Sequence, residues 1–200
     1  MPRRYQMATR ERAVQETRQR IIDAAISLHA QRGVIATNWE EIAGGAGVST
    51  ATVYRHFPSL GELVPACART AFEAGASLPT PAQAAAAFAR LTRPAPRIER
   101  LIRESCRCYE LGAGWLAAAR RDAKSVPALD RAIRLQDRVL GVLIQAALGD
   151  SFVDAQTTMG VIKALIDFPF WKALTDAGVA TETVPQVIND LVRSRLQKRR

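Results

Sequence analysis

The sequence predicts an all-α protein with a small N-terminal head of three helices, built on a helix-turn-helix, and a larger C-terminal helical domain. Apolar residues recur at intervals of three and four along most of the chain, which is the period of an α-helix. Capping residues and glycines mark where these helices start and stop. The run from 38 to 57, N-W-E-E-I-A-G-G-A-G-V-S-T-A-T-V-Y-R-H-F, has the pattern of two short helices joined by a tight turn.

The composition is that of a folded protein outside the membrane. Apolar residues make up 48% of the chain, which is too many for a disordered tail. No uninterrupted apolar run approaches the roughly 18 to 20 residues of a membrane span, and the arginine-bearing N-terminus lacks the apolar core of a signal peptide. We therefore expect a cytoplasmic protein. Its formal net charge is +9, and the position of that charge along the chain bears on its partners.

Residues 1–16 are expected to form a flexible basic arm, helical at most near its end. Its charge suits DNA phosphates, and such arms also reach into the minor groove; simple disorder is the alternative. The charged residues of the first twenty are Arg3, Arg4, Arg10, Glu11, Arg12, Glu16, Arg18 and Arg20. From Thr17, an N-cap residue, a first helix is expected to run to the stop at Gly33. Its apolar stripe is Ile21, Ile22, Ala25, Leu28 and His29, the histidine lying at the edge of the core.

The helix-turn-helix is predicted from its caps and from the residues left on its outer face. Asn38 and Glu41 have the spacing of a capping box, Gly47 allows a left-handed turn, and Ser49 caps the next helix. The apolar residues of the corner have the spacing to face one another: Ile42, Ala43, Ala46, Val48, Val53 and Phe57. The residues left outside are small, hydroxylic, aromatic or basic, which suits the DNA major groove: Thr50, Ala51, Thr52, Tyr54, Arg55 and His56. An ordinary helical corner with a hydrated outer face is the alternative.

Taken with T-R-Q-R-I-I-D-A-A-I-S-L-H-A-Q-R-G (17–33) and Y-R-H-F-P-S (54–59), the run from about 17 to 63 closely resembles the DNA-binding head of the TetR (tetracycline repressor) family. The resemblance implies that Tyr54 and His56 bind phosphates. It places Thr50, Ala51 and Thr52 nearest the bases, with Arg55 suited to either role. Trp39 matches a position that often touches the DNA backbone, although packing is an equal alternative for it. The DNA-binding domain is therefore assigned to residues 17–64.

A fourth helix is expected from Ser59, with Glu62 completing a second capping box. Two residues depart from the usual pattern. Many relatives have a lysine after the serine that contacts phosphate, whereas this chain has Leu60, so that contact is expected to be absent. Pro65 lies past the first helical turn and is expected to bend the helix that leads into the rest of the protein.

Residues 65–200 are assigned to a ligand-binding and dimerisation domain. Breakers at 75–81 and 94–96 separate its helices, which are expected at about 82–91, 97–116, 127–148, 152–177 and 181–198. Three cysteines, Cys67, Cys106 and Cys108, lack C-x-x-C spacing. Neither a disulfide framework, a metal site nor a cofactor is predicted, and all three are interpreted as buried free thiols rather than redox sensors.

The last two helices carry apolar stripes. In the resembling family such helices pair with their symmetry mates in a homodimer, whereas burial within one subunit explains the stripes equally well. A dimer is favoured because a single head reads too few base pairs, and a palindromic operator matches a two-fold axis. The predicted interface residues are Met159, Ile162, Ile166, Val184, Val187, Ile188, Leu191 and Val192.

The resemblance implies a repressor that leaves double-stranded operator DNA when a small molecule binds. The residues proposed to line the ligand site are Phe88, Tyr109, Trp115, Phe168 and Trp171, although each is also an ordinary core residue; they suggest an apolar or amphipathic ligand. An enzyme is disfavoured because no nucleophile elbow, phosphate loop, metal spacing or paired-acid constellation is visible. A helical ligand-binding or assembly module with a degenerate head remains the alternative, on the strength of Leu60.

Overall fold

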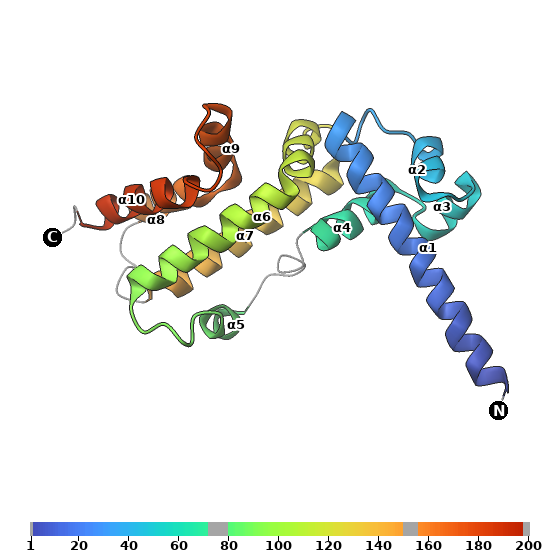
Figure 1. Cartoon of the computed structure of the whole chain (residues 1–200), viewed down its shortest axis with the longest axis horizontal. Coiled ribbons are helices and arrows are strands. Elements are labelled where there is room, and N and C mark those ends of the chain that lie inside the picture. The colour runs from blue at the N-terminus through green and yellow to red at the C-terminus, as the bar shows by residue number, and fades with distance from the viewer. Residues whose placement is uncertain (1, 72–79, 150–155, 198–200) are drawn as a thin grey trace. The chain divides into compact units, whose positions relative to one another are not determined.

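The computed structural model describes residues 2–71, 80–149 and 156–197, and in these ranges the secondary structure is entirely helical (Figure 1). None of the described helices is long and apolar enough to cross a membrane. The helices are α1 (Pro2–Arg32), α2 (Trp39–Ala46), α3 (Thr50–His56), α4 (Leu60–Ala71), α5 (Pro81–Ala86), α6 (Pro94–Asp122), α7 (Pro127–Leu148), α8 (Gln156–Ile166), α9 (Phe168–Asp176) and α10 (Val184–Gln197).

The chain divides into two compact units. The first unit contains Met1–Glu73 and Gly114–Ile133, and the second contains Ala74–Ala113 and Arg134–Arg200. The helix-turn-helix therefore shares its unit with the end of α6 and the start of α7. The domain boundary expected after residue 64 falls inside α4, which runs without interruption to Ala71.

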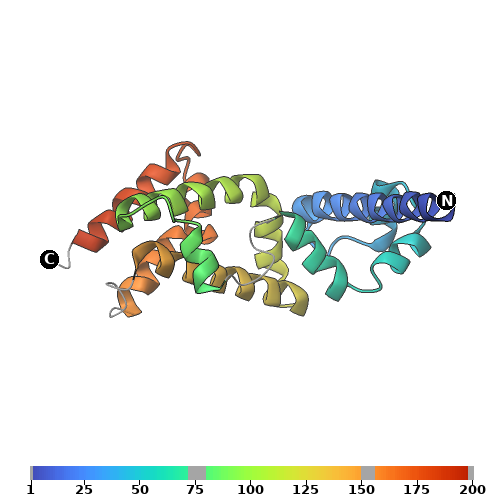
Figure 2. The ribbon, with the colours of Figure 1, turned by 90° about the horizontal axis from the view of Figure 1, so that it is seen from below.

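Helix α1 begins at Pro2 rather than at Thr17, so the expected flexible arm is a helix continuous with the head. Proline is tolerated in the first turn of a helix, and no breaker follows it before Gly33. Arg12 and Glu16 form an i,i+4 ion pair with 3.0 Å between Nε and Oε1, which adds a small local stabilisation. The predicted core residues Ile21, Ile22 and Ala25 are buried as expected. Helix α1 packs on α2 and α4 (Figure 2).

The expected caps of the helix-turn-helix are present. The Asn38 side chain accepts a hydrogen bond from the Glu41 amide at 2.8 Å, and the Glu41 side chain accepts one from the Asn38 amide at 3.2 Å. Gly47 has φ 65° and ψ 41°, the left-handed conformation that ends α2. The Ser49 hydroxyl then accepts a hydrogen bond from the Thr52 amide at 3.2 Å. These hydrogen bonds cap the helices at the corner between α2 and α3, and each joins residues within five positions of one another.

The end of α6 contacts the loop that follows α1, which lies 88 residues earlier in the chain. The Asp122 carboxylate, 6% exposed, accepts hydrogen bonds from the amides of Val34 at 2.7 Å and Ile35 at 3.2 Å, in the loop that follows α1. Gly33 in the same loop has φ +100°, and a Cβ there would lie 2.7 Å from Asp122 Oδ2 and 2.1 Å from Arg121 Nη2. A glycine is therefore required where the α1–α2 loop meets α6.

The helices of the second unit differ from the predicted ones mainly at their ends. Helix α6 starts at Pro94 instead of after the Pro94–Pro96 run, because proline fits the first helical turn. Helix α5 ends at Ala86, earlier than predicted, whereas α7 has the predicted limits. The predicted breaker at 75–79 and the predicted helix start at 152–155 lie outside the described residues.

The single helix predicted for 152–177 is two helices. Helix α8 ends at Ile166 and α9 starts at Phe168, with the Asp167 carboxylate accepting a hydrogen bond from the Phe168 amide at 2.7 Å. Pro169 in the first turn of α9 has no amide to continue the hydrogen bonds of α8. The break lets α8, α9 and α10 pack on one another in the second unit.

Two of the three cysteines are buried free thiols as predicted, and the third is not. Cys67 and Cys106 are buried, and burial raises the pKa of each thiol to about 12. Cys108 is exposed, so its predicted burial is wrong. The reason is helical geometry, since residues two apart on α6 point in different directions and only one of this pair turns inward.

Candidate nucleic-acid interface

The outer face of α3 carries the residues predicted to read DNA. Val53 is 0% exposed and Phe57, which follows the helix, is 1% exposed, so they anchor α3 to the rest of the first unit. Ala51, Tyr54 and Arg55 are exposed on the other side, and Thr50, Thr52 and His56 are half-buried. All six predicted contact residues of α3 are thus at least partly exposed, whereas Val53 alone in this helix is buried.

The Thr52 hydroxyl belongs to a small polar network at the start of α3. It lies 3.0 Å from the Ser49 hydroxyl, and Arg55 Nη2 donates a hydrogen bond to it at 3.4 Å. The network holds the Arg55 side chain along the helix. Thr52 therefore supports the arginine as well as presenting its own methyl and hydroxyl groups.

Trp39, for which packing and phosphate contact are equal alternatives in the sequence, packs on Tyr54. The two ring centroids are 5.1 Å apart and the planes are inclined by 37°. Trp39 is half-buried, whereas Tyr54 is 45% exposed. The indole ring of α2 thus braces the phenol of α3 and leaves the edge of that phenol accessible to solvent.

His56 lies beside two arginines at the end of α3. The Arg18 guanidinium of α1 stands 4.8 Å from the centroid of the Phe57 ring, an arrangement typical of a cation–π contact. Burial lowers the pKa of His56, and the positive charges of Arg55 and Arg18 lower it further. A neutral imidazole at pH 7 donates one N–H, which suits a phosphate oxygen.

A charged contact at the surface joins α1 to α2. Arg32 Nη1, at the end of α1, lies 2.5 Å from Glu41 Oε1, and the other oxygen of Glu41 accepts the hydrogen bond from the Asn38 amide. The glutamate therefore serves both as a cap and as an ion-pair partner. Local spacing in the sequence predicts the cap, but it does not identify the arginine.

Three of the five predicted ligand-site residues form one aromatic cluster in the second unit. Tyr109 of α6 packs edge-on against Phe168 of α9, with centroids 5.6 Å apart, and Phe168 stacks on Trp171 at 5.7 Å. All three are buried. Phe88 and Trp115 are also buried, and Trp115 lies in the segment assigned to the first unit.

Five of the eight predicted dimer-interface residues are buried inside a single chain. These five are at most 1% exposed within a single chain and are therefore core residues: Ile162, Ile166, Val184, Ile188 and Val192. Met159 and Val187 are half-buried, and Leu191 is 42% exposed. An apolar stripe shows that a helix face is covered, but it does not show whether the cover comes from the same chain or from a partner.

Sequence similarity to known proteins is concentrated in the helix-turn-helix head. Residues 21–67 match the family model described as bacterial regulatory proteins, tetR family. The HTH-type transcriptional regulator AcrR of Shigella flexneri is 47% identical over 49 residues, which make up 24% of this chain and 23% of AcrR. The chain therefore aligns with less than a quarter of that relative's length.

Similarity to solved structures extends over both units. A member of the TetR family from Streptomyces coelicolor A3 is 27% identical with a TM-score of 0.63, covering 88% of this chain and 97% of that one. The multidrug binding protein EbrR complexed with ethidium is 28% identical with a TM-score of 0.56, covering 88% and 97%. A helix-turn-helix head followed by a helical second domain is thus the architecture of the whole described chain.

Proposed function

Because this chain is a member of the TetR family of bacterial regulatory proteins, we propose that it is a cytoplasmic, homodimeric transcriptional repressor that a small molecule releases from a palindromic operator. The outer face of α3 is the observation that carries this proposal. On the inner side of α3, Val53 and the following residue Phe57 are fully buried. The residues on the outer side are those that suit a major groove. In this proposal Thr50, Ala51 and Thr52 lie nearest the base edges, Tyr54 and His56 bind phosphates, and Arg55 is suited to either role.

Homodimer formation is proposed because two recognition helices must sit about 34 to 36 Å apart to enter successive major grooves. Burial of five predicted interface residues narrows the proposed interface to the outer sides of α8 and α10. Leu191 and Val161 are 42% and 38% exposed there, and Met159 and Val187 border them as half-buried residues. Exposed large apolar side chains on two neighbouring helices are typical of a surface that a second subunit covers.

The ligand is proposed to be apolar or amphipathic and to bind beside the Tyr109, Phe168 and Trp171 cluster. Trp171 Nε1 is buried without a hydrogen-bond partner in the structure, so it is a donor suited to a polar atom on an otherwise apolar ligand. EbrR, one of the similar structures, is complexed with ethidium in one case and proflavin in another. This supports a flat, amphipathic molecule as the first ligand to test.

Isothermal titration with ethidium, in the absence of DNA, checks the ligand class. We expect saturable binding that weakens about tenfold or more in Trp171→Ala, because that substitution removes a large part of the aromatic cluster. Trp39→Ala, in the other unit, is the matched control and should leave ethidium affinity unchanged. Preference for a strongly charged ligand such as citrate over ethidium would contradict the proposal.

Coupling between ligand and DNA is reciprocal by thermodynamic necessity. Helix α4, which contains Pro65, is the last helix of the head before the chain enters the second unit, and α6 is one of the helices that span the division between the units. We propose them as the elements whose position the ligand changes. The factor by which the ligand weakens operator binding should equal the factor by which operator DNA weakens ligand binding.

Substitutions on α3 separate phosphate contacts from base contacts. Tyr54→Phe should weaken binding to every duplex by about tenfold, because it removes one hydrogen bond to a charged phosphate while keeping the ring that packs on Trp39. Thr50→Val or Thr52→Val should instead change base preference. Gel shifts with duplexes from the DNA upstream of the protein's own gene measure both effects.

Footprinting on the same DNA tests the dimer. Two protected half-sites about one helical turn apart are expected. A single protected half-site would contradict the dimer, and a gel-shift series in which neither Tyr54 nor the threonines matter would refute the DNA-binding assignment. The alternative, a helical module with a degenerate head and Leu60 in place of a phosphate-binding lysine, predicts no salt-dependent binding to any duplex.

A further inference from the structure

Helix α1 is longer than its packing in the head requires. It has 31 residues, yet from residue 9 onward, where exposure is described, residues 9–16 are all exposed and the first buried residue is Ile21. At about 1.5 Å per residue, the segment 2–16 extends roughly 22 Å beyond the part that packs on the head. Figure 1 shows this end of α1 running past α2 and α3. We call residues 2–16 the helical extension.

One side of the helical extension is a continuation of the side of α1 that contacts the end of α3. Arg18 marks this side, because its guanidinium lies over the Phe57 ring at the end of α3. Val14 and Arg10 precede Arg18 by four and eight residues, so they lie on the same side of α1. A helix side that starts beside the predicted phosphate contact His56 thus continues outward along the extension.

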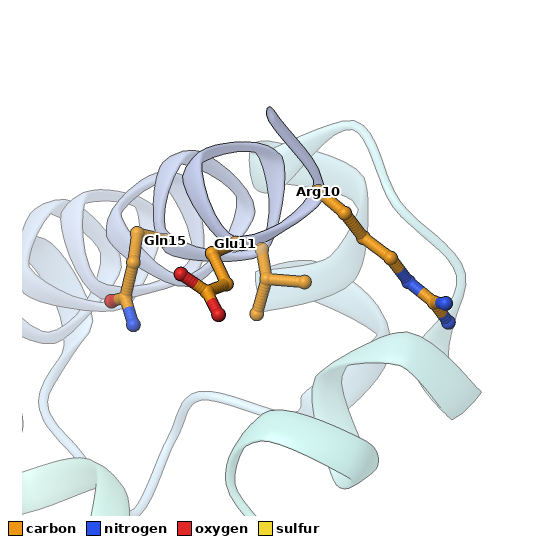
Figure 3. Close-up of a pocket in the computed structure, with 4 residues that line it drawn as sticks. Arg10, Glu11 and Gln15 are labelled. Carbon is orange, nitrogen blue, oxygen red and sulfur yellow. The ribbon is translucent and has the colours of Figure 1, made fainter. Parts of the chain in front are cut away.

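That side is hollowed and partly apolar. The described residues that border a surface hollow here are Arg10, Glu11, Val14 and Gln15. Figure 3 shows the three labelled side chains leaving α1 around this hollow, with Arg10 reaching furthest from the helix. Val14 is 45% exposed, which is unusual for a valine on the continuation of a core stripe.

The helical extension has an ion-paired arginine on one side and, on the other, an arginine outside every ion pair that the described residues form. Arg12, whose side chain is 82% exposed, is paired with Glu16 on the side away from the hollow. No ion pair found among the described residues includes Arg10, which is exposed. The positive charge of Arg10 is therefore available to an anionic partner, while Glu11 opposes it.

Resting on the proposed function, we infer that the helical extension is a second DNA-docking surface. Its Arg10, Val14 and Arg18 side lies against the sugar–phosphate backbone next to the base pairs that α3 contacts. Arg10 and Arg18 bind phosphates, and Val14 packs on a deoxyribose. A rigid helix places these groups at fixed distances from α3, so the extension lengthens the footprint of each head. Glu11 limits the affinity of this contact through repulsion by phosphate.

Salt-dependent binding to a non-specific duplex of about 30 base pairs tests this surface, since non-specific binding is dominated by phosphate contacts. Fluorescence anisotropy between about 50 and 200 mM salt gives the slope of log K against log[salt]. Arg10→Ala should make this slope shallower by about 0.9 for each phosphate that the variant no longer neutralises. Arg12→Ala removes the same charge from the other side and is the matched control; its slope should stay near that of the wild type. Glu11→Gln should tighten binding.

A second variant tests whether the helix itself is needed. Ala13→Pro keeps every charge but breaks the extension, so it should lose as much affinity as Arg10→Ala, with circular dichroism confirming that the head stays folded. Equal effects of Arg10→Ala and Arg12→Ala, or wild-type affinity in Ala13→Pro, would overturn the docking surface. If the wild-type protein binds no duplex at about 50 mM salt, the proposed function itself fails, an outcome that the unmodified protein alone reveals.

Discussion

Replacing Asp122 with alanine is expected to lower the free energy of unfolding by about 3 kcal/mol. The Asp122 carboxylate accepts hydrogen bonds from the amides of Val34 and Ile35 and from Arg121 Nε, the last at 3.1 Å. Alanine leaves the buried Val34 amide and the partly buried Ile35 amide without an acceptor, and each amide left in this way costs about 1 to 3 kcal/mol. Urea unfolding followed by circular dichroism measures the change.

Asp122→Asn is the control for this prediction. Both backbone hydrogen bonds end on Asp122 Oδ2, so an amide oxygen in that position still accepts both. The amide lacks the charge that strengthens these bonds, and its NH2 group takes the place of the oxygen that accepts from Arg121 Nε, so its cost should be about half that of alanine. Burial alone would raise the pKa of the Asp122 carboxyl, but the Ile35 amide, the Arg121 guanidinium and the Val34 amide together lower it. A destabilisation of under about 1 kcal/mol in Asp122→Ala would show that water replaces the carboxylate at this loop.

The Asp122 contact has a consequence for regulation. It ties the loop after α1 to the last residue of α6, and Arg121 adds a hydrogen bond from Nη2 to the Arg32 carbonyl at 3.1 Å. Gly114, also in the first unit, would bring a Cβ within 3.0 Å of Ala30 Cβ, so α6 and α1 approach closely. In the proposed response to ligand, these packed contacts would carry a displacement of α6 to the head in addition to the chain connection.

The DNA-binding corner is predictable from the sequence because its signals are local. Asn38, Glu41, Gly47 and Ser49 act on neighbours within five residues, so their spacing in the sequence is also their geometry in the fold. The outer face of α3 follows from the same spacing once Val53 is known to face inward. Helical spacing alone therefore places the six predicted contact residues on one short helix.

Features that depend on distant residues are not predictable in this way. Asp122 lies 88 residues from the amide that it caps, and nothing in its neighbourhood distinguishes it from a solvated aspartate. The stripe that contains Ile162 and Ile188 shows that a helix face is covered, but it does not reveal what covers it; both residues are buried within a single chain. The full length of α1 is hidden because Thr17 is a suitable N-cap, whereas the chain before it contains no residue that stops a helix except Pro2, which fits the first turn.

Acid is expected to destabilise this protein through His29, between pH 6.5 and about 4. His29 is 0% exposed, and neither ring nitrogen has a hydrogen-bond partner in the structure. Burial lowers the pKa of His29 from 6.5 to about 4, although the nearby Asp122 carboxylate opposes this shift. The folded state therefore holds a neutral imidazole through a pH range in which the unfolded chain takes up a proton. The free energy of unfolding should fall by about 1.4 kcal/mol per pH unit in this range, and by about 3 kcal/mol in all.

His29→Leu should remove this dependence, because leucine fills a similar volume and no hydrogen bond is broken. Urea unfolding at pH 7.5 and pH 4.5 separates the two proteins: the variant should be close to the wild type at the higher pH and more stable at the lower one. His56→Gln, which changes the half-buried histidine of α3, is the control and should keep most of the acid sensitivity. The lowered pKa of Asp122 acts only as pH falls below the ordinary carboxyl range, so it does not contribute between these two values. Equal acid sensitivity in His29→Leu and the wild type would show that His29 gains a proton without leaving the core.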